Sequence, residues 1–287
     1  MNNYVIFTDA ACDISADKLK AWGVLCVSMT FRFDNDKNEY TNDDMDIKTF
    51  YGKMRDGNVA KTAAINADVF MSAFENVLAQ GTDVLYIGFS SGLSSTYNSA
   101  RLASLELQNK YPDRKMIMVD SLSGSAGLGL LLYLTLEQKN AGASIEQAAE
   151  YAENIKLKIC HWFTVDDLVY LKRGGRISPT VAFVGNALGI KPVLYVDENG
   201  KLVKQDKARG RKNALNVLAD KYGELCDGAV KTVYISHSDC ENDAKELEQI
   251  MQSRYDVKVD MITDIGSILG AHAGPGTVAL FFVGKER

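Results

Sequence analysis

The segment VLYIGFSSGLSSTYNSARLASLEL, residues 84–107, joins an apolar run to a helical pattern and carries five hydroxyl side chains at the junction. The run VLYIG is apolar without interruption, which is typical of a strand covered on both faces of a sheet. The pattern that follows, from residue 95 onward, favours a helix. An apolar strand followed by a helix is the repeating unit of a parallel α/β sheet.

The same alternation of strand and helix continues on both sides of this segment. It predicts a first α/β domain at residues 1–157, with a mostly parallel sheet flanked by helices. The later segment KPVLYVDENGKLVKQDKARG, residues 191–210, favours two antiparallel strands around the turn DENG. We therefore expect a second, mixed α/β domain at residues 158–287. The ligand site is expected in the cleft or tunnel at the junction of the two domains.

Composition excludes several classes of function. The chain has 287 residues, 46% hydrophobic residues and a net charge of −5. Its Lys and Arg are scattered, which argues against nucleic acid as a partner. Three histidines without metal-ligand spacing and five cysteines without a CxxC pair predict no metal site and reduced thiols. The longest apolar stretch, AGLGLLLYLTL, has about half the length of a membrane span, and no signal peptide is recognisable. We expect a cytoplasmic protein without stable membrane insertion.

The hydroxyl side chains at the junction have two interpretations. Ser94 stands where an N-cap residue belongs, so its side chain can satisfy a free N–H group of the first helical turn. One cap does not explain the whole group, however. A helix N-terminus with its free N–H groups and positive dipole also suits a carboxylate or a phosphate. The group comprises Ser90, Ser91, Ser94, Ser95 and Thr96.

The same segment raises an alternative function. GFSSG, residues 88–92, matches the G-x-S-x-G nucleophile elbow of serine hydrolases and lies between a strand and a helix. Ser90 would then be the nucleophile, with Asp264 and His272 as acid and base. No histidine precedes His161, so the usual oxyanion loop is missing, and Asp264 and His272 are close in sequence. We keep the serine hydrolase as the alternative only.

Two further segments carry candidate site residues. In HAGPG, residues 272–276, the turn holds His272 on rigid backbone, and an imidazole can donate to a carboxylate oxygen. Thr62 in AKTAAIN is either a turn residue or a further hydroxyl for the site.

Two basic clusters are also candidates. The basic loop LKRGGRIS, residues 171–178, is either a solvated turn or a docking position for an acidic partner or a phosphate group. It contributes Lys172, Arg173 and Arg176. In a second basic cluster, KARGRK, Arg209 precedes a helix and could reach into the cleft.

Several segments together resemble the DegV family, which includes the fatty-acid-binding subunit of bacterial fatty acid kinase (FakB type). They follow one another from residue 7 to residue 282, so the resemblance covers nearly the whole chain. The segments are FTDAACDIS, AKTA, FSSGLSSTYNSA, VDSLSGSAGLG, LKRGGRIS, LGIKPVL, KARGRKNAL and HAGPGTVALFF. The resemblance implies two α/β domains with a lipid tunnel that binds one long-chain fatty acid. It also implies a substrate-presenting subunit that is not itself an enzyme and that needs no cofactor besides the bound acid.

The resemblance also assigns roles to residues. Thr62, His272 and one of Ser91 and Ser94 would hold the carboxylate, and Arg209 or Arg211 would approach it. The loop with Lys172, Arg173 and Arg176 would meet a separate ATP-dependent fatty acid kinase. A lipid-sensing regulator would use the same pocket residues, so that function stays open. The chain departs from the family pattern at Ala10, Ser95 and residues 64–66, which affects head-group packing and chain selectivity.

Overall fold

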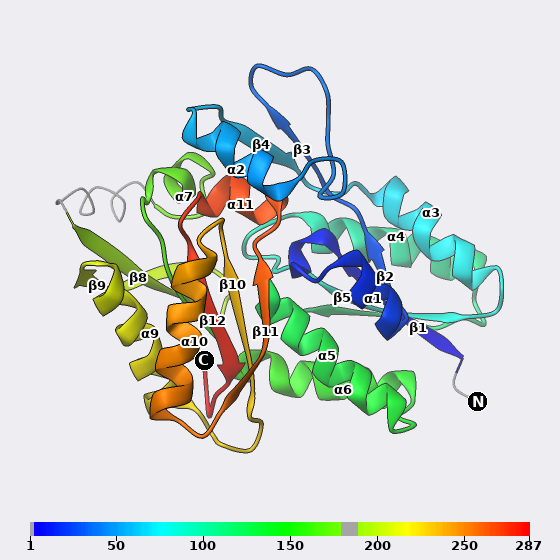
Figure 1. Ribbon diagram of the computed structural model, residues 1–287. Coiled ribbons are helices and arrows are strands. Elements are labelled where there is room, and N and C mark those ends of the chain that lie inside the picture. Colours follow the sequence, from blue (N-terminus) through cyan, green and yellow to red (C-terminus); the bar gives the residue numbers. More distant parts are fainter. Residues whose placement is uncertain (1–2, 179–188) are drawn as a thin grey trace.

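The computed structural model describes residues 3–178 and 189–287. Leu188, the first residue of the LGIKPVL segment, lies outside this part of the chain. Two large sheets with their helices make up the body of the molecule, and a smaller two-stranded sheet projects from it (Figure 1). The predicted α/β class is confirmed.

The first large sheet contains four parallel strands in the order β2, β1, β5, β6. Strand β5 contains the apolar run VLYIG, and its residues 84–88 are all buried, as expected for a strand with helices on both faces. The strands are β1 Tyr4–Asp9, β2 Val24–Val27, β5 Asp83–Gly88 and β6 Met116–Asp120. The accompanying helices are η1 Ala10–Cys12, α1 Ala16–Trp22, α3 Ala67–Leu78, α4 Thr96–Lys110 and α6 Ile145–Ile155.

The second large sheet contains six strands in the order β11, β10, β12, β7, β8, β9. Only β10 and β11 are parallel, and β8 and β9 form the predicted antiparallel hairpin. The strands are β7 Ile159–Thr164, β8 Ile190–Val196, β9 Leu202–Arg209, β10 Thr232–His237, β11 Lys258–Asp264 and β12 Val278–Val283. The helices are η2 Lys156–Lys158, α7 Val169–Arg173, α9 Arg211–Leu225, α10 Glu241–Arg254 and α11 Ser267–Ala273.

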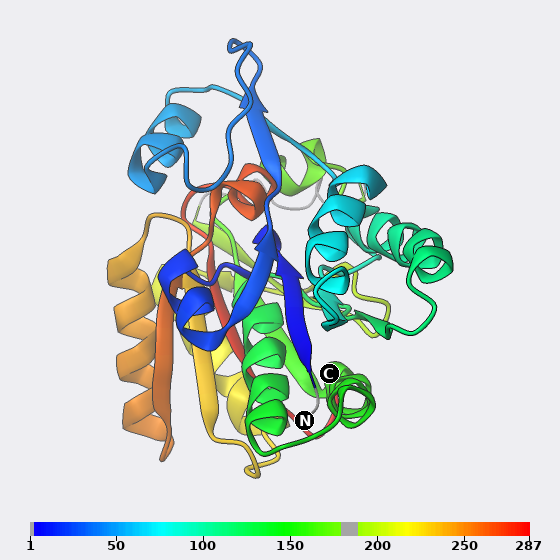
Figure 2. The same ribbon diagram turned by 90° about the vertical axis from the view of Figure 1, so that its right-hand side faces the viewer.

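Helix α5, Ala126–Asn140, lies between the two large sheets (Figure 2, green). It contacts β5 of the first sheet and β7, β10 and β12 of the second. Its sequence, AGLGLLLYLTLEQKN, is apolar on all sides through its first three turns, which is typical of a buried core helix. One hydrophobic cluster includes residues of both sheets and of α5, for example Phe7 on β1, Phe281 on β12 and Leu130 on α5. The two halves therefore share a core, and the division at residues 157 and 158 stays a prediction.

The small sheet joins the two halves at a second place. Its strands β3, Thr30–Phe33, and β4, Ala60–Ala63, are antiparallel, and α2, Ile47–Arg55, lies between them in sequence. All three elements contact α11 of the second half. The hydroxyl of Tyr51 on α2 donates to the carbonyl oxygen of Ile265 at 2.7 Å, and Ser267 donates to Asn42 Oδ1 at 2.6 Å. Contacts from the first half of the chain thus fix the N-terminal end of α11.

Asp13 makes a third buried connection. Its carboxylate accepts hydrogen bonds from Ser125 Oγ at 2.6 Å and from the backbone N–H of Gly266 at 2.9 Å. These partners stand at the beginnings of α5 and α11. Burial raises the pKa of Asp13 to about 7, and nearby Asp264 adds to the rise, against the lowering effect of the two hydrogen bonds.

No helix in the described ranges combines the length and the apolar character that crossing a bilayer requires.

The pKa of Asp13 predicts how stability depends on pH. Since its pKa is raised in the folded state, the folded chain binds more protons than the unfolded chain between pH 4 and pH 7. The contribution of Asp13 to the free energy of unfolding therefore falls as pH rises through this window, by at most about 4 kcal/mol. Denaturant unfolding at pH 4.5 and pH 8 checks this, with Asp13→Asn as the non-titrating control. The free energy of unfolding of the wild type, relative to that of Asp13→Asn, should be lower at pH 8 than at pH 4.5. The same relative value at both pH values would contradict the assignment.

Candidate functional site

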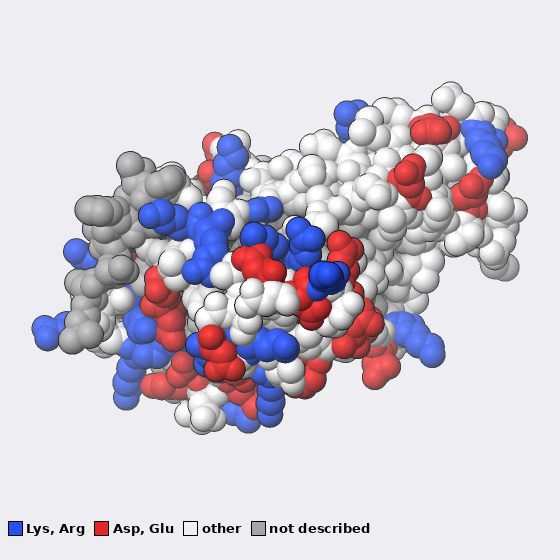
Figure 3. Space-filling model, turned by 90° about the horizontal axis from the view of Figure 1, so that it is seen from above, with Lys and Arg blue, Asp and Glu red and all other residues white. Residues whose placement is uncertain are grey.

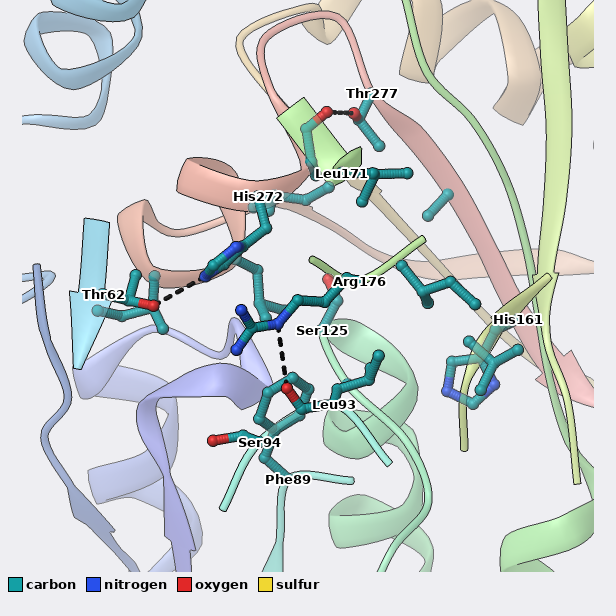
Figure 4. A pocket seen from close by; sticks show the side chains of 18 of the residues that line it. Thr62, Phe89, Leu93, Ser94, Ser125, His161, Leu171, Arg176, His272 and Thr277 are labelled. Atoms are coloured by element: carbon teal, nitrogen blue, oxygen red, sulfur yellow. Dashed lines mark hydrogen bonds between the residues drawn. The ribbon is translucent and has the colours of Figure 1, made fainter. Parts of the chain in front are cut away.

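A cavity of about 180 Å³ lies between the second sheet, α11, α7 and the loop after β5. Most of its wall is apolar, with Phe89 and Leu93 from the first half and Phe163, Ile268 and Phe281 from the second. Polar side chains gather at one part of the wall (Figure 4). An apolar cavity with a few convergent polar groups is the usual form of a small-molecule site.

Thr62 and His272 face each other at this polar part of the wall (Figure 4). Thr62 comes from β4 and His272 from α11, and Thr62 Oγ1 lies 2.8 Å from His272 Nε2. The other ring nitrogen, Nδ1, packs against Gly174 and has no hydrogen-bond partner in the described chain. A Cβ atom at position 174 would lie 2.2 Å from Nδ1, so this position requires glycine. Burial, and secondarily the charge of Arg176, lowers the pKa of His272 to about 4. His272 is therefore neutral at physiological pH.

Ser94 also lines the cavity. Its hydroxyl lies 2.9 Å from Thr96 Oγ1 and accepts from the backbone N–H of Thr96 at 3.2 Å. Thr96 Oγ1 in turn accepts from the backbone N–H of Ile65 at 3.3 Å. This network orients Ser94 and links the loop after β5 to the loop after β4. Thr62 lies in β4 itself. The hydroxyl of Ser94 thus has a fixed position beside the cavity.

Arg176 is the cationic side chain of the cavity wall. Its Nε donates to the carbonyl oxygen of Leu93 at 3.1 Å, and its Nη1 donates to the carbonyl oxygen of Gly174. It forms no ion pair with a carboxylate of the described residues, and partial burial lowers its pKa. The family resemblance implies that Arg176 is a partner-binding residue. The structure instead brings it to the cavity, where its charge favours an anionic ligand.

Three predicted head-group residues lie elsewhere. Ser91 is exposed, and its backbone N–H donates to Asp120 Oδ1 at 3.1 Å. Arg209 is exposed at the end of β9, because the strand's alternation turns its neighbour Ala208 inward. Arg211 is held by Asp243 through its Nε at 2.8 Å. None of these three residues lines the cavity, so the structure does not bring them to Thr62, Ser94 and His272.

The geometry required for a serine hydrolase is absent. Ser90 is fully buried and donates to the carbonyl oxygen of Gly200 at 2.8 Å. Asp264 lies near His237, whose Nδ1 is 3.4 Å away, while His272 pairs with Thr62. In the described chain Ser90 has no histidine partner, so the alternative with Ser90, Asp264 and His272 as a triad is wrong.

The last turn of α7 presents the other predicted partner-binding residues to solvent. Lys172 and Arg173 are exposed, and the guanidinium of Arg173 lies 5.7 Å from the ring centre of Tyr170. Figure 3 shows Lys and Arg side chains gathered on the face that is uppermost in Figure 1, the side on which Figure 1 labels α7. This surface is suited to an acidic partner.

His161 is a cavity residue that no sequence motif marks as functional. It lies on β7 and is buried. It nevertheless lines the cavity (Figure 4). Nothing in the run ICHWFT distinguishes a histidine beside a cavity from one packed in a core.

Comparison with known proteins identifies the family. The sequence model described as "Uncharacterised protein, DegV family" matches residues 3–285, and the chain belongs to this family. The "DegV domain-containing protein CPE0026" of Clostridium perfringens is 41% identical over 291 residues, covering 100% of this chain and 99% of the relative.

Solved structures share the fold. A DegV lipid binding protein from Thermotoga maritima has a TM-score of 0.87 at 29% identity, covering 99% of both chains. A stearic-acid-binding protein from Eubacterium ventriosum has a TM-score of 0.88 at 26% identity, covering 98% of both chains.

The lowered pKa of His272 can be measured directly. We expect the imidazole NMR signals of His272 to stay constant from pH 8 to pH 5.5, because the ring remains neutral. In Arg176→Met the pKa of His272 should rise, since one positive neighbour is lost while burial remains. Inflection of the wild-type signals near pH 6.5 would contradict the assignment.

Proposed function

We propose that the chain binds one long-chain fatty acid, with the acyl chain in the apolar cavity and the carboxylate at Thr62, Ser94, His272 and Arg176. This proposal rests on one observation. The Thr62–His272 pair lies beside the Arg176 guanidinium, which has no carboxylate partner among the described residues, at one part of an otherwise apolar cavity. The lipid-binding and stearic-acid-binding descriptions of the two structural relatives support this proposal.

The chemistry of the polar residues suits a carboxylate. A carboxylate that leaves water needs several donors, and its burial is unfavourable unless the charge is compensated. Arg176 supplies the compensating charge, and the two hydroxyls and the imidazole can supply donors. The acyl chain then contributes most of the affinity, at about 0.8 kcal/mol for each buried methylene. The polar residues fix which end of the ligand lies where.

We further propose that the protein presents this carboxylate to a separate ATP-dependent kinase, which forms an acyl-phosphate for phospholipid synthesis in the cytoplasm. The chain carries no P-loop motif for holding a nucleotide. The exposed last turn of α7, with Lys172 and Arg173, is the docking surface in this proposal. A lipid-sensing regulator would have the same cavity, and only the reaction of the kinase distinguishes the two functions.

Fatty-acid binding is tested with the delipidated protein. Isothermal titration with stearic acid should give one site, and Thr62→Val or Arg176→Met should weaken binding about 10-fold or more, because each removes a hydrogen bond to a charged group. Ser91→Ala is the matched control for Ser94→Ala, and only the Ser94 variant should lose affinity. Mass spectrometry of lipid extracted from the purified protein should find one fatty acid per chain. If the purified protein contains no fatty acid and also fails to bind added stearic acid, the proposal is overturned.

Presentation to a kinase is tested separately. Mixed with a fatty acid kinase and ATP, the loaded protein should yield acyl-phosphate. Arg173→Glu should lower the rate about 10-fold or more by reversing a charge at the docking surface, without changing stearic-acid affinity. Arg101→Glu, an exposed charge reversal on α4, serves as the control and should react normally. Binding without any acyl-phosphate formation would instead support the regulator.

A further inference from the structure

Four cavity residues form a row across the second sheet. Phe281 of β12 pairs with His161 of β7, and Val196 of β8 pairs with Leu202 of β9. The antiparallel register of β7 with β8 brings His161 level with Val196. All four side chains line the cavity, and we call them the end row.

The end row lies far from the residues assigned to the carboxylate (Figure 4). Thr277 directly precedes β12 and follows α11, which carries His272. Thr277, Ala279 and Phe281 line the cavity at alternate positions, so the cavity follows one face of the extended chain. The step from Thr277 to Phe281 spans about 14 Å. The acyl chain therefore has this face of the sheet to lie along.

The next residues on the same face show where the cavity ends. Val283 pairs with Ile159, and these residues stand two positions beyond Phe281 and His161 on β12 and β7. Both side chains are almost fully buried, and neither lines the cavity. Packed side chains, rather than solvent, therefore lie behind the end row on these two strands.

Arg287 connects the segments behind the end row. Its Nε donates to the carbonyl oxygen of Ile159 at 3.0 Å. Its Nη atoms donate to the carbonyl oxygen of Asp197 and to Ser123 Oγ, both at 3.1 Å. Each of these partners stands within two residues, in sequence, of a residue that lines the cavity. The guanidinium thus holds three segments of the wall together at the far end.

Phe281 is the largest side chain of the end row. Its ring stands perpendicular to the imidazole of His161, with ring centres 5.4 Å apart. On its other side it reaches α5, where a Cβ atom at Gly127 would lie 2.8 Å from Phe281 Cδ1. The ring therefore fills the space between β7 and α5, and replacing it by a small side chain opens space at the end of the cavity.

We propose that the end row is the blind end of the acyl-chain cavity, and that Phe281 sets the upper limit of chain length. The inference rests on the proposed fatty-acid function and specifies its substrate class as monocarboxylic acids with an apolar end. A close-packed wall does not expand at low cost, so a longer chain would have to displace side chains. A second carboxylate at the far end would be buried without a free counter-ion, because Arg287 is already engaged.

The experiment measures which acids the delipidated full chain takes from a mixture. The protein is equilibrated with equimolar lauric, myristic, palmitic, stearic, arachidic and behenic acids, and the bound acids are identified by mass spectrometry. Occupancy should rise with chain length, because each buried methylene adds affinity, and then fall sharply at a limit.

Variants assign this limit to the end row. Phe281→Ala should move the limit to the next longer acid, whose occupancy relative to the wild-type optimum should rise about 10-fold, the gain from burying two further methylenes. Val196→Phe fills the same end and should move the limit to a shorter acid. Phe282→Ala is the matched control, because this neighbour faces the opposite side of the sheet and packs against Tyr222, with ring centres 5.0 Å apart. It should leave the distribution unchanged.

A diacid tests whether the far end is closed. Octadecanedioic acid has the chain length of stearic acid and a carboxylate at each end. Isothermal titration should show that it binds at least about 10-fold more weakly than stearic acid, because its second charge would be buried.

The outcomes separate the inference from the proposed function. The inference alone is overturned if acids bind but neither Phe281→Ala nor Val196→Phe moves the limit, or if the diacid binds as tightly as stearic acid. Because Val196→Phe shifts the limit in the opposite direction, it decides the question even if Phe281→Ala fails to fold. If the wild type binds none of the acids, the proposed function is overturned as well.

Discussion

The hydrogen bond between Thr62 and His272 depends on a short helix held in place from the opposite half of the molecule. Helix α11 has seven residues, fewer than an isolated helix needs for stability, so tertiary contacts must fix it. Hydrogen bonds with Asp13, Asn42 and Tyr51, all in the first half of the chain, fix its N-terminus, and α7 of the second half packs against it. The position of His272 is therefore a property of the junction between the two halves. A cavity whose polar residues come from both halves forms only when the halves are packed together.

Arg176 is the one charged side chain among the described residues that line this cavity. Arg176 provides the positive charge, and that charge adds to the effect of burial in keeping His272 neutral. One cation beside a neutral imidazole and two hydroxyls matches a ligand with a single negative charge and an uncharged remainder. A second cation would favour a dianion, and a cavity without Arg176 would leave a bound carboxylate uncompensated.

The sequence predicts the framework of this molecule better than the direction of individual charged side chains. The uninterrupted apolar run of β5 and the DENG turn between β8 and β9 define their local structure, because strand burial and turn chemistry are short-range properties. Arg173 ends α7 and Arg176 follows it by three residues, yet Arg173 is exposed and Arg176 lies in the cavity wall. Which of them turns inward depends on the carbonyl oxygens of Leu93 and Gly174, and Leu93 is distant in sequence. Strand alternation, in contrast, could have placed Arg209 outside, since Ala208 is the residue that fits the buried face.

The two cavity histidines show how one physical cause can give two different chemical groups. Burial keeps both rings neutral, and in both a glycine lets the backbone approach a ring nitrogen: Gly174 beside His272 Nδ1, and Gly127 beside His161 Nε2. The remaining nitrogen decides the role. His272 directs Nε2 to Thr62 at the polar part of the wall, whereas His161 commits Nδ1 to the backbone carbonyl of Ile159. Since a side chain at either glycine would displace the imidazole, the chemistry of each histidine is set by a residue that contributes no chemistry of its own.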